Sequence, residues 1–551
     1  MLKITRQTTQ EFARRTFENV VAKHQRQIPR ADAVKSFRDL IMATPQEKLA
    51  NALEKLRRLQ TAGHAVLRSG QLERRERELL VENGFIEPII NGWYAPANPD
   101  APRGDTTAWY ASYWDFVRTY LTERLGDEWS LSPEQSLSLH AGQWSVPAQL
   151  LVRAPNGRNQ KTDLIHGASI YEARLDPARG EDLVEVEGLR AYTPEAALVA
   201  AGPGAYVNAP TEMRTVLSLQ RDASALLSRL LDGRTHIAGR LAGAFRNIGR
   251  NRDADAIIAA MRSAGYDIRE NDPFETRVDG AAFGRDRSAY AQRIRLLWEN
   301  WRGPVRENFP PPPKTPIEPE GYLQGVDDLY QTDAYHSLSI EGYRVSPDLI
   351  ERVRRGAWNP QVNADDRRLA DGLAARGYWE AFQAVRASVR DVLTGANCGK
   401  VADRDHGAWY RALFSPSVRA GLLKPASLAG YRGGRVFISK SRHVPMHADG
   451  VRDAMPVFFE LLAAEPDPAV RVVLGHFIFV YIHPYVDGNG RMGRFLMNLM
   501  MAAGGYPWTV IPVQARDDYM TALEAASHNG DIVPFAQFLA HRVGRDAPTA
   551  E

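Results

Sequence analysis

The residues best suited to chemistry lie in one stretch of twelve residues near the C-terminus, from His483 to Arg494. An imidazole titrates near neutral pH and takes a proton from an attacking hydroxyl, while a carboxylate offers Mg²⁺ a hard oxygen. Glycine loops and guanidinium groups bind phosphate oxygens. These groups here are His483, Asp487, Gly488, Gly490, Arg491 and Arg494. Together they predict the transfer of a phosphate-linked group from a nucleoside triphosphate.

Two apolar segments must position this stretch. Val470 to Ile482 is apolar on every face and predicts a buried helix, which Pro484 cannot continue. Phe495 to Ala503 is again apolar and favours a helix. The stretch between them is therefore predicted to be a tight loop that enters a helix N-terminus, where free amides bind anions. A histidine cap with surface ion pairs would not explain why these groups crowd one glycine loop.

The stretch closely resembles the Fic family motif H-x-F-x-D/E-G-N-G-R-x-x-R, with Tyr485 in place of the usual Phe. The resemblance implies that His483 is the general base and Asp487 the Mg²⁺ ligand. Gly490 stands where the phosphorylating, Doc-like branch commonly has lysine, which favours the adenylylating branch. The nucleotide-binding residues that it implies are Gly488, Asn489, Gly490, Arg491 and Arg494, with Tyr519 from a weaker pattern downstream.

The resemblance implies a protein adenylyltransferase that uses ATP and Mg²⁺. The hydroxyl of a target Ser, Thr or Tyr would attack the α-phosphorus, pyrophosphate would leave, and AMP would remain on the target. An alternative is a DNA-binding regulator or antitoxin-like protein whose Fic domain senses a nucleotide. Removal of AMP, with Glu341 positioning a water molecule, and transfer of another nucleotide also stay open.

A second pattern lies about 150 residues upstream. Ser337 and Glu341 are four residues apart and share a face on a helix, which Gly342 then ends. A single glutamate on a helix is usually just solvated. The pattern S/T-x-x-x-E-G/N is nevertheless the inhibitory-helix motif of Fic proteins. It implies an inhibitory helix at about 330–345, in which Glu341 pairs with Arg494 and blocks the γ-phosphate position.

Two further features carry the resemblance to Fic proteins. Arg435, Val436, Phe437 and Ile438 follow a glycine turn and predict a short β segment. It resembles the family's flap, which binds the target peptide as an added strand. Tyr519 would lie near the nucleotide base, although a core aromatic residue fits its pattern equally well.

The N-terminal region carries an excess of positive charge. Residues 1–80 hold 17 Lys and Arg against 9 Asp and Glu, which suits a polyanion or a solvated helical face. A helix, a charged helix and a hairpin closed by Asn91-Gly92 predict a winged helix-turn-helix. Arg74, Arg75 and Arg77 would then contact nucleic acid, or they would pair with neighbouring glutamates.

Residues 99–300 predict mixed α and β structure. Strands are expected at 149–153 and 183–186, and helices at 195–201 and 213–231. With the winged helix, this region loosely resembles the AbiEi family of bacterial antitoxin and regulator proteins. The segments that carry the resemblance are Leu72 to Leu80, Gly92 to Tyr94, Ser132 to Gln135 and Leu150 to Ala154.

Length and composition agree with a multidomain globular chain. The 551 residues are 44% hydrophobic and 25% charged, Cys398 is the single cysteine, and no apolar run approaches the roughly 18 residues of a membrane span. We expect a cytoplasmic protein with a protein target and no membrane contact, and leave DNA binding and homodimerisation open. The expected parts are a helical and winged-helix domain (1–98), a mixed α/β domain (99–300), a Pro-rich linker (301–320) and a mainly α-helical Fic domain with a β-hairpin flap (321–551).

Overall fold

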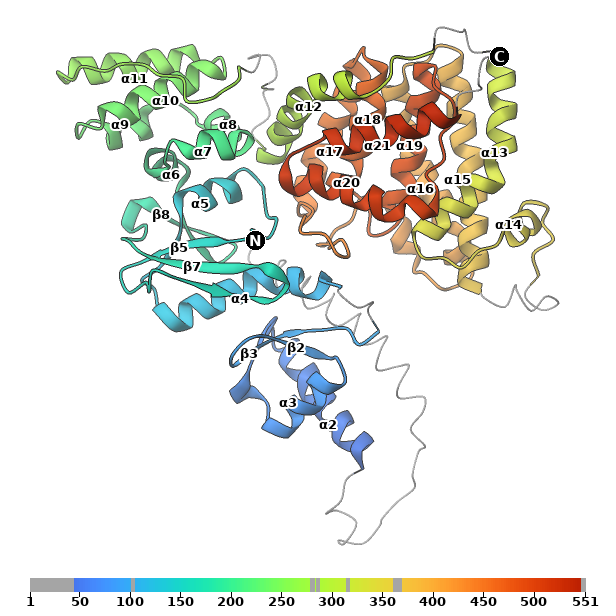
Figure 1. Ribbon diagram of the computed structural model, residues 1–551, viewed down its shortest axis with the longest axis horizontal. Helices are drawn as coiled ribbons and strands as arrows, with labels where there is room; N and C mark the ends of the chain where they lie inside the picture. Colours follow the sequence, from blue (N-terminus) through green and yellow to red (C-terminus); the bar gives the residue numbers. More distant parts are fainter. Residues whose placement is uncertain are drawn as a thin grey trace. The chain divides into compact units, whose positions relative to one another are not determined.

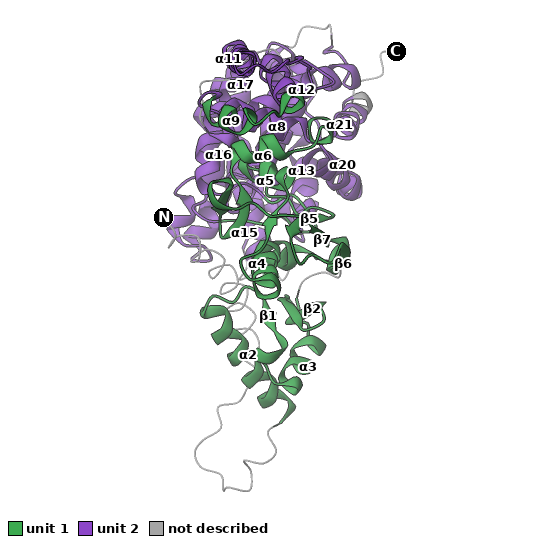
Figure 2. Cartoon of the chain, turned by 90° about the vertical axis from the view of Figure 1, so that its left-hand side faces the viewer, with its two compact units in different colours: residues 1–208, 224–237, 435–444 green, residues 209–223, 238–434, 445–551 purple. Residues whose placement is uncertain are grey.

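The computed structural model describes residues 44–100, 105–277, 283, 288–313, 318–359 and 369–546. The chain forms two compact units, coloured separately in Figure 2. Unit 1 comprises residues 1–208, 224–237 and 435–444, and unit 2 comprises residues 209–223, 238–434 and 445–551. The first part of the expected N-terminal helical segment, residues 1–43, lies outside the described residues.

The first part of unit 1 is a small helical and β structure with its own core. A capping box between Thr44 and Glu47 starts its first helix, and Leu56, Leu67 and Leu80 are buried together. Two helices and a hairpin with Asn91-Gly92 at its turn follow one another in the predicted order, and a short strand pairs with the hairpin to give the sheet order β1-β3-β2. The elements are α2 (Pro45–Thr61), β1 (Leu67–Arg68), α3 (Arg74–Glu82), β2 (Ile86–Ile90) and β3 (Trp93–Pro96).

The rest of unit 1 packs helices against a four-stranded sheet of order β4-β5-β7-β6. Strands β5 and β7 are parallel and the other pairs are antiparallel. The predicted strands at 149–153 and 183–186 are confirmed within one residue as β5 and β8. The elements are α4 (Thr107–Leu125), β4 (Ser130–Leu131), α5 (Pro133–His140), β5 (Leu150–Ala154), β6 (Gln160–Asp163), β7 (Ser169–Arg174), β8 (Leu183–Val186), β9 (Leu189–Tyr192), α6 (Pro194–Ala200), α7 (Gly204–Asn208) and α9 (Ser224–Leu230).

The single helix predicted over 213–231 is wrong. The chain forms α8 (Pro210–Leu219) in unit 2, breaks at residues 220–223 and then forms α9 in unit 1. Arg250 donates from Nη1 to the carbonyl oxygens of Leu217 and Gln220, at 3.0 and 2.5 Å. The guanidinium of the residue that precedes α11 therefore supplies donors to carbonyl groups at the end of α8.

Unit 2 is a helical bundle, so the described chain is mainly helical, with small sheets confined to its N-terminal part. Helices α13 and α15 run side by side (Figure 1). None of the described helices combines the length and the apolar character needed to cross a bilayer. Besides α8, its helices are α10 (Thr235–Asn247, which begins at the boundary with unit 1), α11 (Asn251–Ser263), α12 (Ala289–Asn308), α13 (Pro319–Ile340), α14 (Pro347–Arg354), α15 (Leu369–Leu393), α16 (Cys398–Arg419), α17 (Ala448–Ala464), α18 (Pro468–Ile482), α19 (Asn489–Gly504), α20 (Arg516–Asn529) and α21 (Val533–Asp546).

The proline segment packs against this bundle, whereas the sequence predicted a linker over 301–320. Helix α12 continues to Asn308 and packs on α17, so the residues on both sides of the prolines belong to unit 2. Phe309 is buried edge-to-face against Tyr506, whose hydroxyl donates to Pro310 O at 2.7 Å. Phe309 thus anchors the proline segment to the bundle. The composition of the segment alone does not predict this contact with Tyr506.

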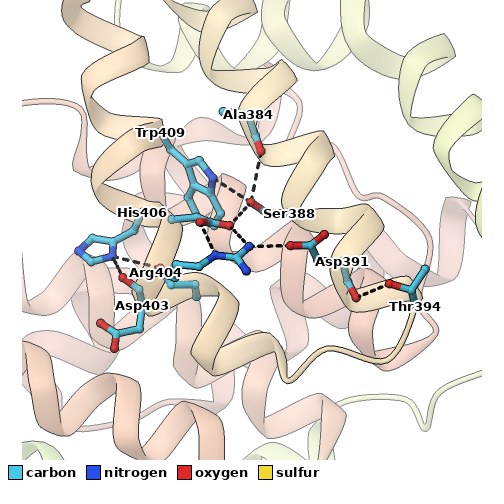
Figure 3. A network of polar contacts seen from close by, with 10 residues as sticks. Ala384, Ser388, Asp391, Thr394, Asp403, Arg404, His406 and Trp409 are labelled. Atoms are coloured by element: carbon cyan, nitrogen blue, oxygen red, sulfur yellow. Dashed lines mark hydrogen bonds and ion pairs between the residues drawn. The ribbon is translucent and has the colours of Figure 1, made fainter.

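Polar contacts fix α15 against α16 (Figure 3). Trp409 Nε1 donates to Ser388 Oγ at 3.2 Å, and Ser388 Oγ donates to Asp405 Oδ2 at 2.7 Å. Arg404 donates to Asp391 Oδ2 at 2.6 Å. Three side chains of α16 are thereby tied to α15, which sets the register of the two helices.

We expect Gly377→Ala to destabilise unit 2 by about 2 kcal/mol, because a Cβ there would overlap the backbone carbonyl of Leu413 on α16. The matched control is Gly325→Ala on α13, where the added methyl group meets open space. It should stabilise the protein by about 0.5–1 kcal/mol through helix propensity. Urea unfolding measures both. Equal effects would show that α15 and α16 do not approach as closely as described.

Candidate active site

The loop after α18 holds His483 in a left-handed conformation, with φ 55° and ψ 59°. Its backbone N–H donates to Phe479 O at 3.0 Å, and its Nδ1 lies 3.2 Å from Val480 O. A carbonyl oxygen only accepts, so Nδ1 carries the proton and Nε2 keeps a lone pair. The end of the helix therefore fixes both the position and the tautomer of the imidazole.

The ring of His483 is half-buried, and its environment disfavours the imidazolium form. Burial is the main cause and the charge of Arg432 adds to it, so the pKa of His483 falls to about 4. The nearby Glu341 acts in the opposite direction and does not outweigh them. We expected an imidazole with a near-neutral pKa. The structure instead gives one that is unprotonated across the whole neutral range.

Arg432 is a residue of this site that the sequence analysis missed. Its side chain is 1% exposed and donates to His483 O at 2.7 Å, to Gly434 O at 2.8 Å and to Met446 O. No carboxylate is among these partners, and burial lowers the pKa of Arg432 to about 10. The guanidinium caps the carbonyl end of α18. A basic residue at a helix C-terminus is a general signal, but here it comes from 50 residues upstream.

The start of α19 has free backbone donors, as predicted. Gly488 adopts φ 80° immediately before the helix, and no side chain caps the first turn. A Cβ at Gly488 would also meet the ring of Phe414, so this position requires glycine for both reasons. The unoccupied first-turn amides form an anion site of the kind that phosphates use.

The side chain of Asn489, which was expected to bind phosphates, binds the backbone of its own loop. Its side chain is buried and bonds the backbone of Tyr485 in both directions, with Oδ1 accepting from N–H and Nδ2 donating to O, each at 2.9 Å. It therefore closes the loop on itself. Its predicted direct contact with phosphates is not supported by this geometry.

Tyr485 anchors the loop in the core, as the sequence suggested for an aromatic ring at this place. It is 1% exposed and stacks on Tyr410 of α16, with centroids 3.8 Å apart and an interplanar angle of 6°. Burial raises the pKa of Tyr485, so the phenol stays neutral. The hydroxyl does not prevent this packing.

Asp487 is the carboxylate best placed to hold a metal ion. It is 63% exposed, its Oδ1 accepts from Gly488 N–H at 2.6 Å, and its Oδ2 lies 3.5 Å from Arg491 Nη2. The described residues contain no cluster of three or more potential metal ligands. A single accessible carboxylate fits Mg²⁺, which commonly takes one or two protein carboxylates and completes its shell with water and substrate phosphates.

Arg491 is held between two aromatic rings. Its guanidinium carbon lies 5.3 Å from the ring centre of Tyr343 and 5.1 Å from that of Phe414. The side chain is 1% exposed, and Nε has no partner among the described residues. Two rings thus fix this cation in place through its faces.

Arg494 and the predicted inhibitory residues meet directly. Arg494 donates from Nε to Ser337 Oγ at 2.8 Å, and from Nη2 to Ser337 O at 3.0 Å and Glu341 Oε1 at 2.7 Å. Burial alone would raise the pKa of Glu341, but the charges of Arg494 and Arg491 lower it overall. Gly342, at φ 88°, ends the helix directly after this carboxylate. The structure therefore contains the ion pair that the motif implied.

Gly490 lies directly beneath this ion pair. A Cβ at this position would collide with Glu341 Oε1 and lie 3.3 Å from Arg494 Nη1. The glycine thus leaves the space that the Glu341 carboxylate occupies. A longer side chain here is incompatible with the ion pair.

Tyr519 lies in the core. It is 1% exposed, its hydroxyl lies 2.7 Å from His476 Nε2, and its ring packs near that of Phe535. Burial raises its pKa to about 12. Tyr519 is therefore a core aromatic residue, which was one of the two expectations for it. Its contact with the nucleotide base stays a prediction.

The expected flap does not form a strand in the structure. Residues 435–444 belong to unit 1, where Arg435 pairs with Glu187 and lies over the ring of Trp144. Phe437 packs on the core of that unit, while Val436 and Ile438 are partly buried. Side-chain packing holds this segment without a strand partner, so the β-hairpin expectation is wrong. Target binding by these residues stays a prediction.

The three arginines of the predicted nucleic-acid contact, Arg74, Arg75 and Arg77, have different surroundings. Arg74 pairs with Glu78 at 2.8 Å, and Arg77 donates to Ser69 O at 2.8 Å while stacking over Tyr94. Arg75 is exposed. The first two have structural partners, so nucleic-acid contact by this helix stays a prediction.

We expect Arg432→Ala to lower the free energy of unfolding by about 3 kcal/mol, because several buried carbonyl oxygens lose their donor. The control is Arg452→Ala on α17, where the half-exposed side chain reaches only its own helix. That change should stay within about 0.5 kcal/mol. Denaturant unfolding measures both, and a small loss at Arg432 would show that it does not support the site.

Comparison with known proteins agrees with this geometry. The Fic/DOC family model matches residues 408–501. The protein adenylyltransferase Fic of Nematostella vectensis is 40% identical over 124 residues, which cover 22% of this chain and 28% of that protein. The protein adenylyltransferase Fic of Drosophila virilis is 36% identical over 217 residues, which cover 39% of this chain and 41% of that protein. The solved structure of Fic-1 from C. elegans is 18% identical, covers 62% of this chain and 96% of that one, and has a TM-score of 0.35.

The chain spans less than half the length of the curated relatives it matches. The match of residues 408–501 includes the whole stretch from His483 to Arg494, all of α18, and α19 as far as Met501. The C-terminal region of this chain is a Fic domain.

Proposed function

We propose that this protein is an adenylyltransferase that moves AMP from ATP to a Ser, Thr or Tyr hydroxyl of a target protein and is held inactive by its own helix α13. The observation that carries the proposal is the imidazole of His483, whose Nδ1 contacts Val480 O so that Nε2 keeps its lone pair, in the same loop as an uncapped helix N-terminus. The relatives that match the chain are named protein adenylyltransferases, which supports the same reaction class.

The reaction requires a base and a charge-stabilising site. Nε2 of His483 takes the proton as the target oxygen bonds to the α-phosphorus, and the bond from that phosphorus to the bridging oxygen breaks. Pyrophosphate leaves with the bonding electrons, and AMP stays on the target. The lowered pKa keeps the imidazole unprotonated at neutral pH, at the cost of a weaker driving force for taking the proton. Mg²⁺ held by Asp487 would neutralise phosphate charge.

The site offers hydrogen-bond donors that can bind the phosphates of ATP. The first-turn amides of α19 are uncapped, and Arg494 Nη1 is buried without a hydrogen-bond partner among the described residues. Buried unpartnered donors are costly and commonly mark a ligand site. We assign the outer phosphates to Arg494 and the inner ones to the amides around Gly488 and Gly490.

Glu341 acts as the brake in this proposal. Its carboxylate occupies one nitrogen of Arg494 and fills the space that Gly490 leaves open. A γ-phosphate bound to Arg494 would compete with it and would face its negative charge. A partly buried, charge-assisted pair contributes about 1.5–3 kcal/mol, enough to suppress the productive pose by one to two orders of magnitude.

We expect Glu341→Gly to raise self-labelling by α-³²P-ATP about 10- to 100-fold, because the brake pair is lost. His483→Ala should abolish labelling in either background, because no base remains. Labelled protein on a gel, followed by mass spectrometry of the adduct, measures both. The same assay with α-³²P-UTP and with AMP-modified protein tests transfer of another nucleotide and AMP removal.

Two matched controls accompany this experiment. Glu320→Gly lies near the exposed start of the same helix, and His541→Ala changes an exposed histidine of α21. Both should leave labelling unchanged. Equal labelling in wild type and Glu341→Gly would contradict the brake, and labelling that survives His483→Ala would contradict the base.

The pH dependence follows from the lowered pKa of His483. A base must be unprotonated, so activity is present above its pKa and is lost as the pH falls through that value. At saturating ATP, we expect labelling by Glu341→Gly to stay constant from pH 8 to about 5.5 and to fall only toward pH 4. Circular dichroism at each pH checks the fold. A midpoint near 6.5, the ordinary value for histidine, would contradict the described environment.

A further inference from the structure

Helix α13 carries a third polar residue in line with the two of the inhibitory motif. Asp333, Ser337 and Glu341 follow one another at four-residue spacing, so they share one face of the helix. Ser337 and Glu341 both bind Arg494. Asp333 is 3% exposed, and its charge also acts on Arg494. Two members of the row thus bind one guanidinium, and the third lies one helical turn before Ser337.

The surroundings of Asp333 are otherwise nearly uncharged. The hydroxyl of Tyr378, from α15, donates to Asp333 Oδ2 at 2.8 Å, and Tyr378 itself is fully buried. The titratable groups around the carboxylate are Tyr330, Tyr378 and Arg494. Among the described residues no cation forms an ion pair with Asp333.

A carboxylate in this place is expensive. Burial raises the pKa of Asp333 to about 6, so at neutral pH a charge is kept where an uncharged side chain would cost less. The side chain of Trp508 also acts on the carboxylate as a donor, and the charge of Arg494 lowers the pKa of Asp333 against the effect of burial. Asparagine would keep the hydrogen bond from Tyr378 but would lose this attraction to Arg494.

Arg494 needs a counter-charge in both states of the brake. It is 3% exposed, and in the closed state Glu341 supplies that charge. When Glu341 leaves, Ser337 still accepts from Nε and Nη2 but is neutral. Asp333 is then the remaining carboxylate of α13 that faces the guanidinium.

We propose that Asp333, fixed by the Tyr378 hydroxyl, is a positioning residue that holds Arg494 in place against Ser337 when Glu341 has left it. This inference rests on the proposed function of Arg494 as a phosphate ligand. Glu341 is the removable counter-charge and Asp333 the permanent one. The guanidinium then keeps its orientation, Nη1 stays without a partner, and Nη2 loses one of its two acceptors, so both can bind an anion.

The test measures ATP binding by calorimetry, and KM and kcat for labelling, on the full chain with Glu341→Gly alone and with Asp333→Asn added. We expect about tenfold weaker binding and a similarly raised KM in the double variant, at a nearly unchanged kcat. Loss of a negative charge by itself would strengthen ATP binding, so weaker binding reports positioning. The melting temperature at pH 8 should not fall, because a costly buried charge is removed.

A matched control and a second variant complete the test. Asp328→Asn changes an exposed carboxylate of the same helix and should leave ATP binding unchanged. Tyr378→Phe removes only the hydroxyl and should weaken binding about threefold. If Asp333→Asn does not fold, the same binding measurement on Tyr378→Phe tests the proposal.

The outcomes separate the two proposals. If Glu341→Gly transfers no nucleotide, the proposed function fails, while calorimetry still reports on Asp333. If Glu341→Gly is active and ATP binds equally well with and without Asp333→Asn, the positioning role is overturned. A lower melting temperature with unchanged binding also overturns it, because it would make Asp333 purely structural.

Discussion

The Fic domain is organised around one buried cation, Arg494. A guanidinium that is 3% exposed must find acceptors and a counter-charge within the protein, because leaving it unpaired in the interior is prohibitively costly. Helix α13 supplies these groups from more than 150 residues away, and Arg494 thereby joins α13 to α19. In the proposed mechanism, a bound anion and Glu341 compete for the same guanidinium. The contact that stabilises the bundle is therefore also the contact that would have to change for catalysis.

The loop and its two helices were predictable from sequence because their causes are local. An apolar run and a proline that ends it lie within a few residues of each other, and α18 ends at Ile482 as they predict. Helix α19 starts at Asn489, directly after Gly488 and six residues before the apolar run at Phe495, so the loop is shorter than predicted. The Glu341–Arg494 pair was also anticipated, but through resemblance to Fic proteins. The four-residue spacing of Ser337 and Glu341 predicted that they share one face of a helix. It did not predict that Arg494 packs against that face.

The side-chain partners were less predictable because they come from distant segments. Asn489 bonds its own loop, Arg432 caps a helix that starts 36 residues after it, and Arg250 satisfies the break that divides the helix expected at 213–231. In each case the local pattern fits several partners, and only the packing of the whole chain selects one. The flap failed for the same reason, since residues 435–444 pack with unit 1 and form no strand.

The chain passes between its two units at five places, after residues 208, 223, 237, 434 and 444. Units joined by one linker can be exchanged between proteins as cassettes, but units interwoven in this way cannot be separated by a single cut. Cleavage at any one crossing leaves four covalent connections in place. A fragment that begins after the prolines therefore carries ten residues, 435–444, whose packing partners in unit 1 are missing.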